Sequence, residues 1–218
     1  MRPFAELPER PFAIGTSQTE LLADPAPWAA LFAEQRAIIC RDIFDPVLLD
    51  RLLTAARTTL FREDRVDLGT REVESPQRVG GTLNILLQRA GLYRWVEAVT
   101  GRTGLAGTDG RLVQTRAGAG DALDWHNDLQ QARRALGVTI SFTETPYSGG
   151  TFEMRAVDDP ASTRSFAHDR AGTALIFDLG NDVEHRVLPV LSGGPRRIFT
   201  GWFVREAVLS AAVAGAGR

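Results

Sequence analysis

Three residues in the second half of the chain could together bind a metal ion. His126 and Asp128 are separated by one residue, and His185 follows well down the sequence. Two imidazole nitrogens and one carboxylate oxygen suit a ferrous ion, and such a ligand set leaves other coordination positions open for small molecules. The chain has three histidines in total, so two of them fall where a site of this kind needs them.

The short spacing of the first two candidates also predicts their local structure. Side chains alternate between the two faces of a strand, so an extended segment would point His126 and Asp128 the same way and Trp125 the other way. We therefore predict that one short strand supplies two ligands and that His185 supplies the third from a remote strand. A structural zinc site is disfavoured, because it usually has four protein ligands, often cysteines.

The remaining histidine and the composition narrow the chemistry further. His168 stands in a polar segment, Ala167-His168-Asp169, which predicts a solvated turn. All 25 basic residues are arginines, so Schiff-base chemistry on a lysine is excluded. Any cation that binds a carboxylate must then be a guanidinium. The net charge of -2 gives no reason to expect nucleic acid or an anionic membrane as a partner.

Cys40 is the only cysteine, so an internal disulfide cannot form and a reducing compartment is the default. It lies in an apolar run, where we expect a small buried side chain. Residues 1–15 contain three prolines and no apolar core of signal-peptide length. No stretch approaches the roughly 20 apolar residues that a membrane span needs. We therefore expect a cytoplasmic protein.

The first half of the chain is predicted to be mainly helical. Apolar residues recur there at helical spacing, and Asp45-Pro46 supplies an N-cap followed by a first-turn proline. Gly91 is expected to interrupt or bend the last helix. The predicted helices span 17–23, 27–35, 47–61 and 81–100, and a strand spans 36–43.

From residue 111 onward the pattern changes to short strands separated by turns rich in Gly, Pro, Asn and Asp. Such a series is typical of a β-sandwich or a jelly-roll barrel. We predict one α+β domain over 1–218, with helical support at 1–110, a β core at 111–206 and a flexible tail at 207–218. The predicted strands span 112–116, 137–143, 151–156, 173–177, 184–190 and 197–205.

Four segments of the β region carry a further pattern. They are a Gly-rich approach to the first His and Asp at 118–128, a Ser-Gly-Gly turn with its strand at 148–154, the segment from the second His at 185–190, and a basic residue, apolar strand and Trp at 196–202. Together, residues 112–203 resemble the core of the iron(II)/2-oxoglutarate-dependent dioxygenases, closest to the prolyl-hydroxylase-like branch. The resemblance implies a double-stranded β-helix of jelly-roll or cupin-like type, with His126, Asp128 and His185 as the catalytic iron ligands.

The resemblance also implies 2-oxoglutarate and O2 as cosubstrates beside Fe(II). In this family a basic residue about ten positions after the second His binds 2-oxoglutarate, here Arg196 or Arg197. Adjacent strand residues face opposite ways, but both faces are largely apolar, so alternation does not choose between them. The family's usual distance before the Trp favours Arg196, with Thr200 on the same face as a further hydrogen-bond donor. A Tyr that many relatives carry before the first His is absent, so Gln114 is the expected additional polar residue.

The implied activity is hydroxylation of an unactivated carbon in a small molecule, an amino acid or a peptide. Desaturation or ring closure could come from the same chemistry, whereas halogenation is disfavoured because related halogenases lack the carboxylate supplied here by Asp128. Loops near the ligands are expected to form the substrate pocket, with Gln130 and Arg155 as substrate-binding candidates. The alternative for these loops is a solvated surface.

Two other classes stay open. A cupin-like metalloenzyme that does not use 2-oxoglutarate would bind metal at the same three residues but would need no buried arginine eleven residues after His185. A metal-free β-sandwich binding module would tolerate alanine at His126 and Asp128. A dinucleotide-binding fold is a poor fit, because Gly118-Ala-Gly120 lacks the third glycine and does not open a helix.

Overall fold

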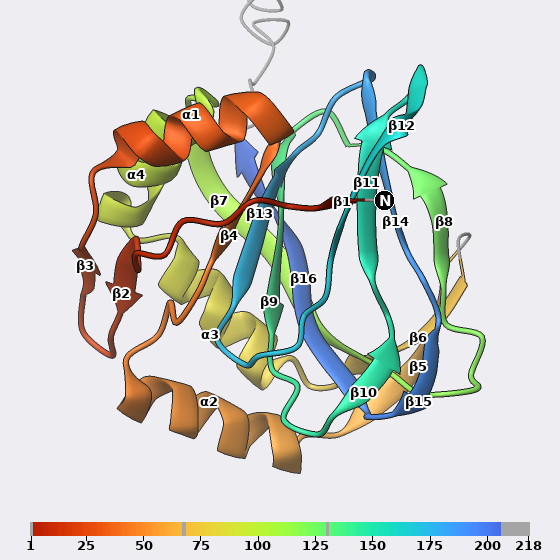
Figure 1. The fold of residues 1–218 in the computed structure, drawn as a ribbon. Helices are drawn as coiled ribbons and strands as arrows, with labels where there is room; N and C mark the ends of the chain where they lie inside the picture. Colours follow the sequence, from red (N-terminus) through yellow and green to blue (C-terminus); the bar gives the residue numbers. More distant parts are fainter. Residues whose placement is uncertain (1, 67–68, 130, 206–218) are drawn as a thin grey trace, which may run out of the picture.

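The computed structural model describes residues 2–66, 69–129 and 131–205 of the 218-residue chain. Two β-sheets lie face to face, and the helices cover the outer face of the larger sheet (Figure 1). The fold is of the predicted class, α+β with a double-stranded β-helix core. The tail predicted at 207–218 and the candidate Gln130 lie outside the described residues.

The larger sheet has seven strands, with antiparallel pairing between neighbours. It combines early and late parts of the chain, so its core cannot form from either half alone. In order across the sheet, the strands are β4 (Ala37–Cys40), β13 (Ala174–Asp178), β9 (Arg134–Ser141), β16 (Arg196–Arg205), β7 (Leu105–Thr115), β6 (Gly69–Glu74) and β5 (Phe61–Val66).

The smaller sheet closes the other side of the β core. Its last two strands, β14 (Val183–Val187) and β8 (Leu123–His126), come from parts of the chain about 60 residues apart and pair antiparallel. Two further antiparallel pairs lie outside these sheets, β10 (Tyr147–Gly149) with β15 (Val190–Gly193) and β2 (Phe12–Ile14) with β3 (Thr19–Leu21). In order, the smaller sheet contains β1 (Arg2–Pro3), β12 (Asp159–Phe166), β11 (Phe152–Ala156), β14 (Val183–Val187) and β8 (Leu123–His126).

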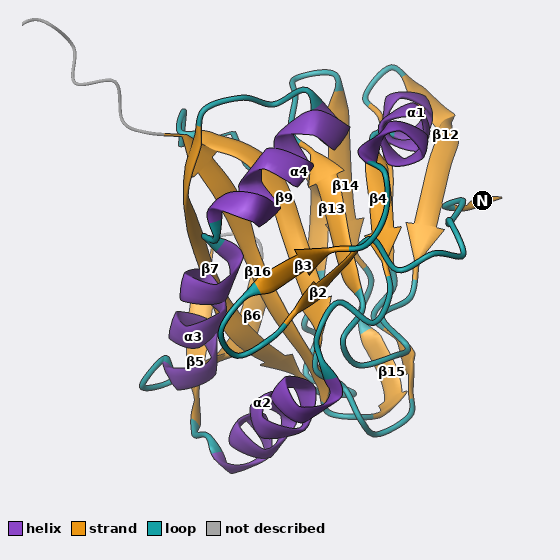
Figure 2. Ribbon diagram, turned by 90° about the vertical axis from the view of Figure 1, so that its left-hand side faces the viewer, coloured by secondary structure: helices purple, strands orange, loops and turns teal. Residues whose placement is uncertain are grey.

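The helices are α1 (Pro25–Gln35), α2 (Pro46–Thr58), α3 (Arg78–Leu87) and α4 (Ala90–Thr100). They lie on one side of the larger sheet, as Figure 2 shows. Asp24 caps α1 by accepting a hydrogen bond from the backbone N–H of Ala26 at 2.9 Å. Proline stands in the first turn of both α1 and α2, where its missing N–H costs nothing. No helix in the described part of the chain is both long and apolar enough to span a membrane.

The larger sheet has an apolar core on each side. Under the helices, the Trp95 indole meets the rings of Phe12 and Trp28 edge to face, with centroid distances of 5.1 and 5.7 Å. The second core lies between the two sheets and includes Phe152 and Phe177, whose ring centroids are 4.9 Å apart. The sheet is therefore fixed on both faces, and side chains that enter the space between the sheets are held by a rigid frame.

Several predicted elements are confirmed and others are wrong. The helices at 27–35 and 47–61 and the strand at 36–43 correspond to α1, α2 and β4. The helix predicted at 17–23 is wrong, because residues 19–21 form strand β3. The segment 81–100 holds two helices, and the break falls at Gln88 and Arg89 just before Gly91. Cys40 is fully buried as expected, and burial raises the pKa of its thiol.

Candidate metal centre

The three predicted ligand residues lie together at one end of the space between the sheets. His126 of β8 stands directly opposite His185 of β14 in the antiparallel register, with their ring centroids 4.3 Å apart. The Asp128 carboxylate lies 3.7 Å from His126 Nε2 and 3.5 Å from His185 Nε2. One ligand atom from each residue lies within 4.8 Å of the others, a spacing suited to one shared metal ion.

The backbone brings Asp128 to this point by a turn and not by strand alternation. Strand β8 ends at His126, and Asp128 has a positive φ of 59°. Aspartate tolerates this left-handed conformation better than most residues. The prediction that the two side chains converge is thus confirmed, but its stated reason was wrong. Trp125 does face the opposite side, where its ring packs against the guanidinium groups of Arg155 and Arg186.

Neighbouring groups fix the orientation of the Asp128 carboxylate. The indole Nε1–H of Trp202 donates to Asp128 Oδ2 at 2.9 Å. The guanidinium of Arg134 stacks on the Trp202 ring at 3.4 Å from its centroid and donates to the Asp128 carbonyl oxygen at 3.1 Å. Trp202 and Arg134 therefore act on the ligand as one stacked pair, and such outer partners tune metal affinity.

The two imidazoles are also oriented by their surroundings. His126 Nδ1 lies 2.6 Å from the Asp124 carbonyl oxygen, so Nδ1 donates and Nε2 is free to bind a metal. His185 is held by aromatic packing, with the rings of Phe152 and Phe177 at 5.5 and 4.8 Å from its centroid. The ligand set is therefore arranged without an ion.

The protonation states of the buried ligands also suit metal binding. Burial is the largest influence on Asp128 and would raise its pKa, but the hydrogen bond and charge of His185, the charge of His126 and the Trp202 hydrogen bond lower it to about 2. Burial lowers the pKa of His185. Near neutral pH the site therefore offers an ionised carboxylate and a neutral imidazole, the forms that bind metal ions.

Two cavities adjoin each other in this region. The metal-side cavity, of about 210 Å³, is lined by His126, Asp128 and His185. The narrow cavity, of about 60 Å³, is lined by Arg196 and His168. Thr139 and Thr200 line both of them. The guanidinium of Arg196 enters the narrow cavity, and the residue is only 5% exposed. Burial lowers the pKa of Arg196, although the charge of Tyr147 and a hydrogen bond with Tyr147 act in the opposite direction. Within the described residues, Arg196 Nε, Thr115 Oγ1 and His168 Nδ1 are buried without hydrogen-bond partners.

The structure separates the two candidate arginines. Arg196 faces the narrow cavity, whereas Arg197 faces the other side of β16, where its Nε donates to Gln114 Oε1 at 2.9 Å. The Gln114 side-chain amide also donates to Glu72 at 2.6 Å. Gln114 therefore lies off both cavities, and its predicted place beside the cosubstrate is corrected, because β7 turns its neighbours Val113 and Thr115 inward instead.

The predicted substrate residue Arg155 also lies elsewhere. Its Nε donates to Glu184 at 2.6 Å, and its guanidinium packs on Trp125 on the outer face of the smaller sheet. It lines a separate cavity with Arg2 and Glu34 and not the metal-side cavity. The alternation of β11 explains this, because neighbouring Met154 is the residue that turns into the space between the sheets.

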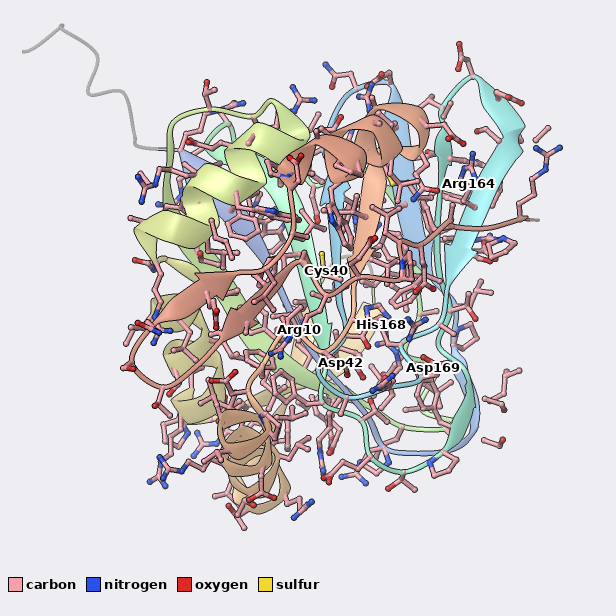
Figure 3. All side chains as sticks on the ribbon, turned by 60° about the vertical axis from the view of Figure 1, so that its left-hand side comes forward. Arg10, Cys40, Asp42, Arg164, His168 and Asp169 are labelled. Atoms are coloured by element: carbon pink, nitrogen blue, oxygen red, sulfur yellow. The ribbon has the colours of Figure 1, made fainter. Side chains whose placement is uncertain are left out.

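The solvated turn predicted at His168 is wrong. His168 is fully buried between the sheets, in the interior position that Figure 3 shows, and it lines the narrow cavity. Its Nε2 lies 2.7 Å from Thr139 Oγ1, and its carbonyl oxygen accepts hydrogen bonds from Ser141 and from the Tyr147 hydroxyl. Burial and the nearby charge of Arg196 hold the pKa of His168 well below its usual value.

Several residues near the site were not predicted from the sequence. Tyr147, the first residue of β10, supplies a hydroxyl beside Arg196. The sequence feature that could have indicated Tyr147 was its position directly before the Ser-Gly-Gly turn. The roles of Arg134 and Trp202 could not be predicted without the fold, because their contacts with Asp128 join β9 and β16 to the end of β8. Arg71 also lines both cavities.

Residues 112–204 match the sequence model of the 2OG-Fe(II) oxygenase superfamily. The match covers less than half of the chain, and it contains all three ligand residues and Arg196. No curated protein sequence matches the chain significantly. The match confirms the enzyme class expected from the sequence, a 2-oxoglutarate- and Fe(II)-dependent dioxygenase, with iron, 2-oxoglutarate and O2 as the implied cofactor and cosubstrates.

Solved structures agree on the fold. An oxidoreductase of the 2OG-Fe(II) oxygenase family from Burkholderia pseudomallei is 16% identical, with a TM-score of 0.66 over 84% of this chain and 92% of that protein. A Pseudomonas putida prolyl-4-hydroxylase is 21% identical, with a TM-score of 0.60 over 84% of this chain and 100% of that protein. A non-heme alpha-ketoglutarate-dependent epimerase from nogalamycin biosynthesis is 14% identical, with a TM-score of 0.61 over 89% of this chain and 92% of that protein.

The residues present fit the implied groups. Two imidazoles and a carboxylate converge with the donor set that Fe(II) accepts while leaving positions open. The adjoining cavity holds a buried cation and unpaired hydroxyl and imidazole groups, which suit a carboxylate.

Proposed function

We propose that the protein hydroxylates an unactivated carbon of a small molecule, an amino acid or a peptide, with Fe(II) and with 2-oxoglutarate and O2 as cosubstrates. The observation that carries this proposal is the buried guanidinium of Arg196, whose Nε has no hydrogen-bond partner among the described residues, in a cavity that adjoins the three ligand side chains. A cupin-like enzyme that ignores 2-oxoglutarate has no use for such a cation, and leaving a buried charge unpaired costs several kcal/mol, on the order of 3 to 5.

Each group has a defined part in this proposal. His126, Asp128 and His185 would hold the iron, which with 2-oxoglutarate and O2 supplies the oxidising power. Arg196 would bind the distal carboxylate of 2-oxoglutarate, with Thr200 as a further donor. The predicted division of the chain, a helical support at 1–110 and a catalytic core at 111–206, is kept as part of the proposal, together with a cytoplasmic location.

The protein's own residues would prepare the site before reaction. Trp202 and Arg134 orient the Asp128 carboxylate, and the Phe152 and Phe177 rings keep water from one side of His185. Thr139 and Thr200 line both cavities, so they would contact the middle of a bound 2-oxoglutarate that extends from the metal to Arg196. The single substrate C–H bond that reacts would then be chosen by the walls of the metal-side cavity.

The test is succinate release from 2-oxoglutarate, with Fe(II), O2 and 2-oxoglutarate each omitted in turn. We expect turnover only when all three are present, including the slow turnover that occurs without a substrate. Arg196→Met should raise the KM for 2-oxoglutarate about a hundredfold, because a buried charge pair is worth about 2–5 kcal/mol. Arg197→Met is the matched control and should stay within about twofold of the wild type, since Arg197 faces away from the cavity. Equal effects of the two substitutions would contradict the proposal.

A further inference from the structure

Arg71 is the cation that stands where the two cavities meet. Its side chain lines both the metal-side cavity and the narrow cavity, and it is 18% exposed. It belongs to β6, which with β5 forms the edge of the larger sheet. The side chain therefore reaches the site from an edge hairpin and not from the barrel strands that carry the ligands and Arg196.

The sheet register explains why this residue points inward. Arg71 and Val73 lie on the same face of β6, and Val73 packs with Val113 and Ile198. Val113 and Ile198 themselves line the narrow cavity. Glu72 faces the opposite side and binds Gln114 and Arg116 there. The direction of Arg71 is thus set by strand alternation across three neighbouring strands.

The guanidinium of Arg71 keeps most of its hydrogen-bonding capacity. Its cross-strand partner is Asp64, and both Nε and Nη2 donate to the single oxygen Oδ2, at 3.2 and 3.1 Å. An arginine has five N–H donors in a fixed fork. Two are used here, and Asp64 is the hydrogen-bond partner of Arg71 among the residues that the structure describes. Nη1 therefore has both of its hydrogens to offer to an incoming anion.

The other two arginines at the cavities already have roles. Arg134 stacks on Trp202 and binds the Asp128 backbone, and Arg196 lies at the closed end that suits the cosubstrate. The remaining walls of the metal-side cavity are largely apolar and include Leu123, Val187 and Phe177. Away from the metal ligands, a molecule in this cavity would thus meet Arg71 as the available cation, the hydroxyls of Thr139 and Thr200, and otherwise mainly apolar surface.

We propose that Arg71 binds a carboxylate of the substrate, so that the substrate is a small organic acid with an apolar body. This inference rests on the proposed function and deepens it by naming the substrate class. Arginine matches a carboxylate with two parallel hydrogen bonds. The cavity volume of about 210 Å³, part of which the cosubstrate would take, favours a compact acid over a long peptide.

The test measures anaerobic binding to protein loaded with Zn(II) and 2-oxoglutarate, by calorimetry and without turnover. The probes are L-leucine, L-proline, L-phenylalanine, hexanoic acid and phenylacetic acid, each beside its primary amide. We expect at least one acid to bind the wild type tenfold or more tighter than its amide. Arg71→Gln should reduce that preference to within twofold, and Arg71→Lys should keep part of it.

The matched control is Arg62→Gln, which removes the charge of an exposed arginine on the same hairpin. It should leave the acid preference unchanged. The affinity for 2-oxoglutarate should stay within twofold in Arg71→Gln.

The inference would be overturned, and the proposed function left intact, if the wild type preferred no acid over its amide. The same holds if the preference survived Arg71→Gln or fell equally in Arg62→Gln. A tenfold loss of 2-oxoglutarate affinity in Arg71→Gln would also overturn the inference, because it would assign Arg71 to the cosubstrate. Failure of the wild type to bind 2-oxoglutarate at all would end both proposals.

Discussion

The two ends of the space between the sheets differ in how well their polar groups are satisfied. At the metal end, Asp128 accepts from Trp202 and His126 Nδ1 is bound to a carbonyl oxygen, so both ligand groups are held, and Arg134 Nε is the buried atom without a partner there among the described residues. At the other end, Arg196 Nε, Thr115 Oγ1 and His168 Nδ1 are buried and unpaired within the described chain. The metal end is thus organised before any ion arrives, whereas the Arg196 end is incomplete and calls for an anion to satisfy it.

One rigid frame thus holds two kinds of binding group. Ligands for a metal must converge, so their neighbours orient them in advance. A cation that binds and releases a cosubstrate in every cycle must keep hydrogen-bonding groups available for it, and Arg196 Nε has no partner in the described chain. Burying the charge of Arg196 lowers the stability of the fold, and the apolar cores on both faces of the larger sheet offset this loss.

Removing a metal ligand tests the organised end and should have the largest effect. We expect Asp128→Ala to lower iron-dependent succinate formation about a thousandfold or more, equivalent to about 4 kcal/mol. Steady-state rates with saturating 2-oxoglutarate measure this. Asn127→Ala is the control, because Asn127 bonds only the Leu129 backbone N–H in the described structure and should keep most of the activity. Near-normal activity in Asp128→Ala would show that the convergence of the three ligands is unrelated to function.

Removing the unpaired cation tests the incomplete end. With Zn(II) and 2-oxoglutarate at about 100 times its Kd, the wild type should gain about 2.7 kcal/mol of stability. Arg196→Met should lose this gain but be as stable as the wild type, or more stable, without ligand, because an apolar side chain replaces a buried charge whose Nε has no hydrogen-bond partner in the described chain. Denaturant titration measures both values. Strong destabilisation of the ligand-free variant would contradict the idea that Arg196 lacks stabilising partners in the ligand-free protein.

Removing the Trp202 hydrogen bond tests whether the indole orients the Asp128 carboxylate at the metal end. Trp202→Phe keeps an aromatic ring under Arg134 but removes the donor to Asp128. We expect metal affinity to fall about 10- to 100-fold, the usual effect of losing an outer partner of a ligand. Competition with a chelator gives the affinity, and 2-oxoglutarate binding to variant saturated with metal should change little. A variant with unaltered metal affinity would show that the indole does not orient the ligand.

The pH dependence of stability tests the buried imidazole at the incomplete end. Burial and the facing charge of Arg196 hold the pKa of His168 below its ordinary value of 6.5. As pH falls below 6.5, the unfolded chain takes up a proton that the folded state refuses, so stability present above this pH is lost. The loss should be about 1.4 kcal/mol for each pH unit. His168→Gln, which retains a donor toward Thr139, should lack this component when ligand-free unfolding is compared at pH 7.5 and 5.5. Parallel pH profiles for the two proteins would contradict it.

The sequence predicted the metal end better than the Arg196 end, for physical reasons. The ligands and Arg196 follow from residue types at family spacing, and α1 and α2 follow from local apolar periodicity and their first-turn prolines. Strand β5 was missed because its charged residues, typical of an edge strand, hide any alternation. The burial of His168 was missed because it depends on Ser141, Tyr147 and Arg196, which come from distant parts of the chain.

The most direct measurement is an anaerobic titration of the protein with ferrous iron and then with 2-oxoglutarate. We expect one iron per chain and a weak visible absorption band when 2-oxoglutarate is added, with Arg196→Met needing about a hundredfold more 2-oxoglutarate to reach it. Folded wild-type protein that binds iron but develops no band at any 2-oxoglutarate concentration would contradict a role for 2-oxoglutarate and favour a cupin-like enzyme.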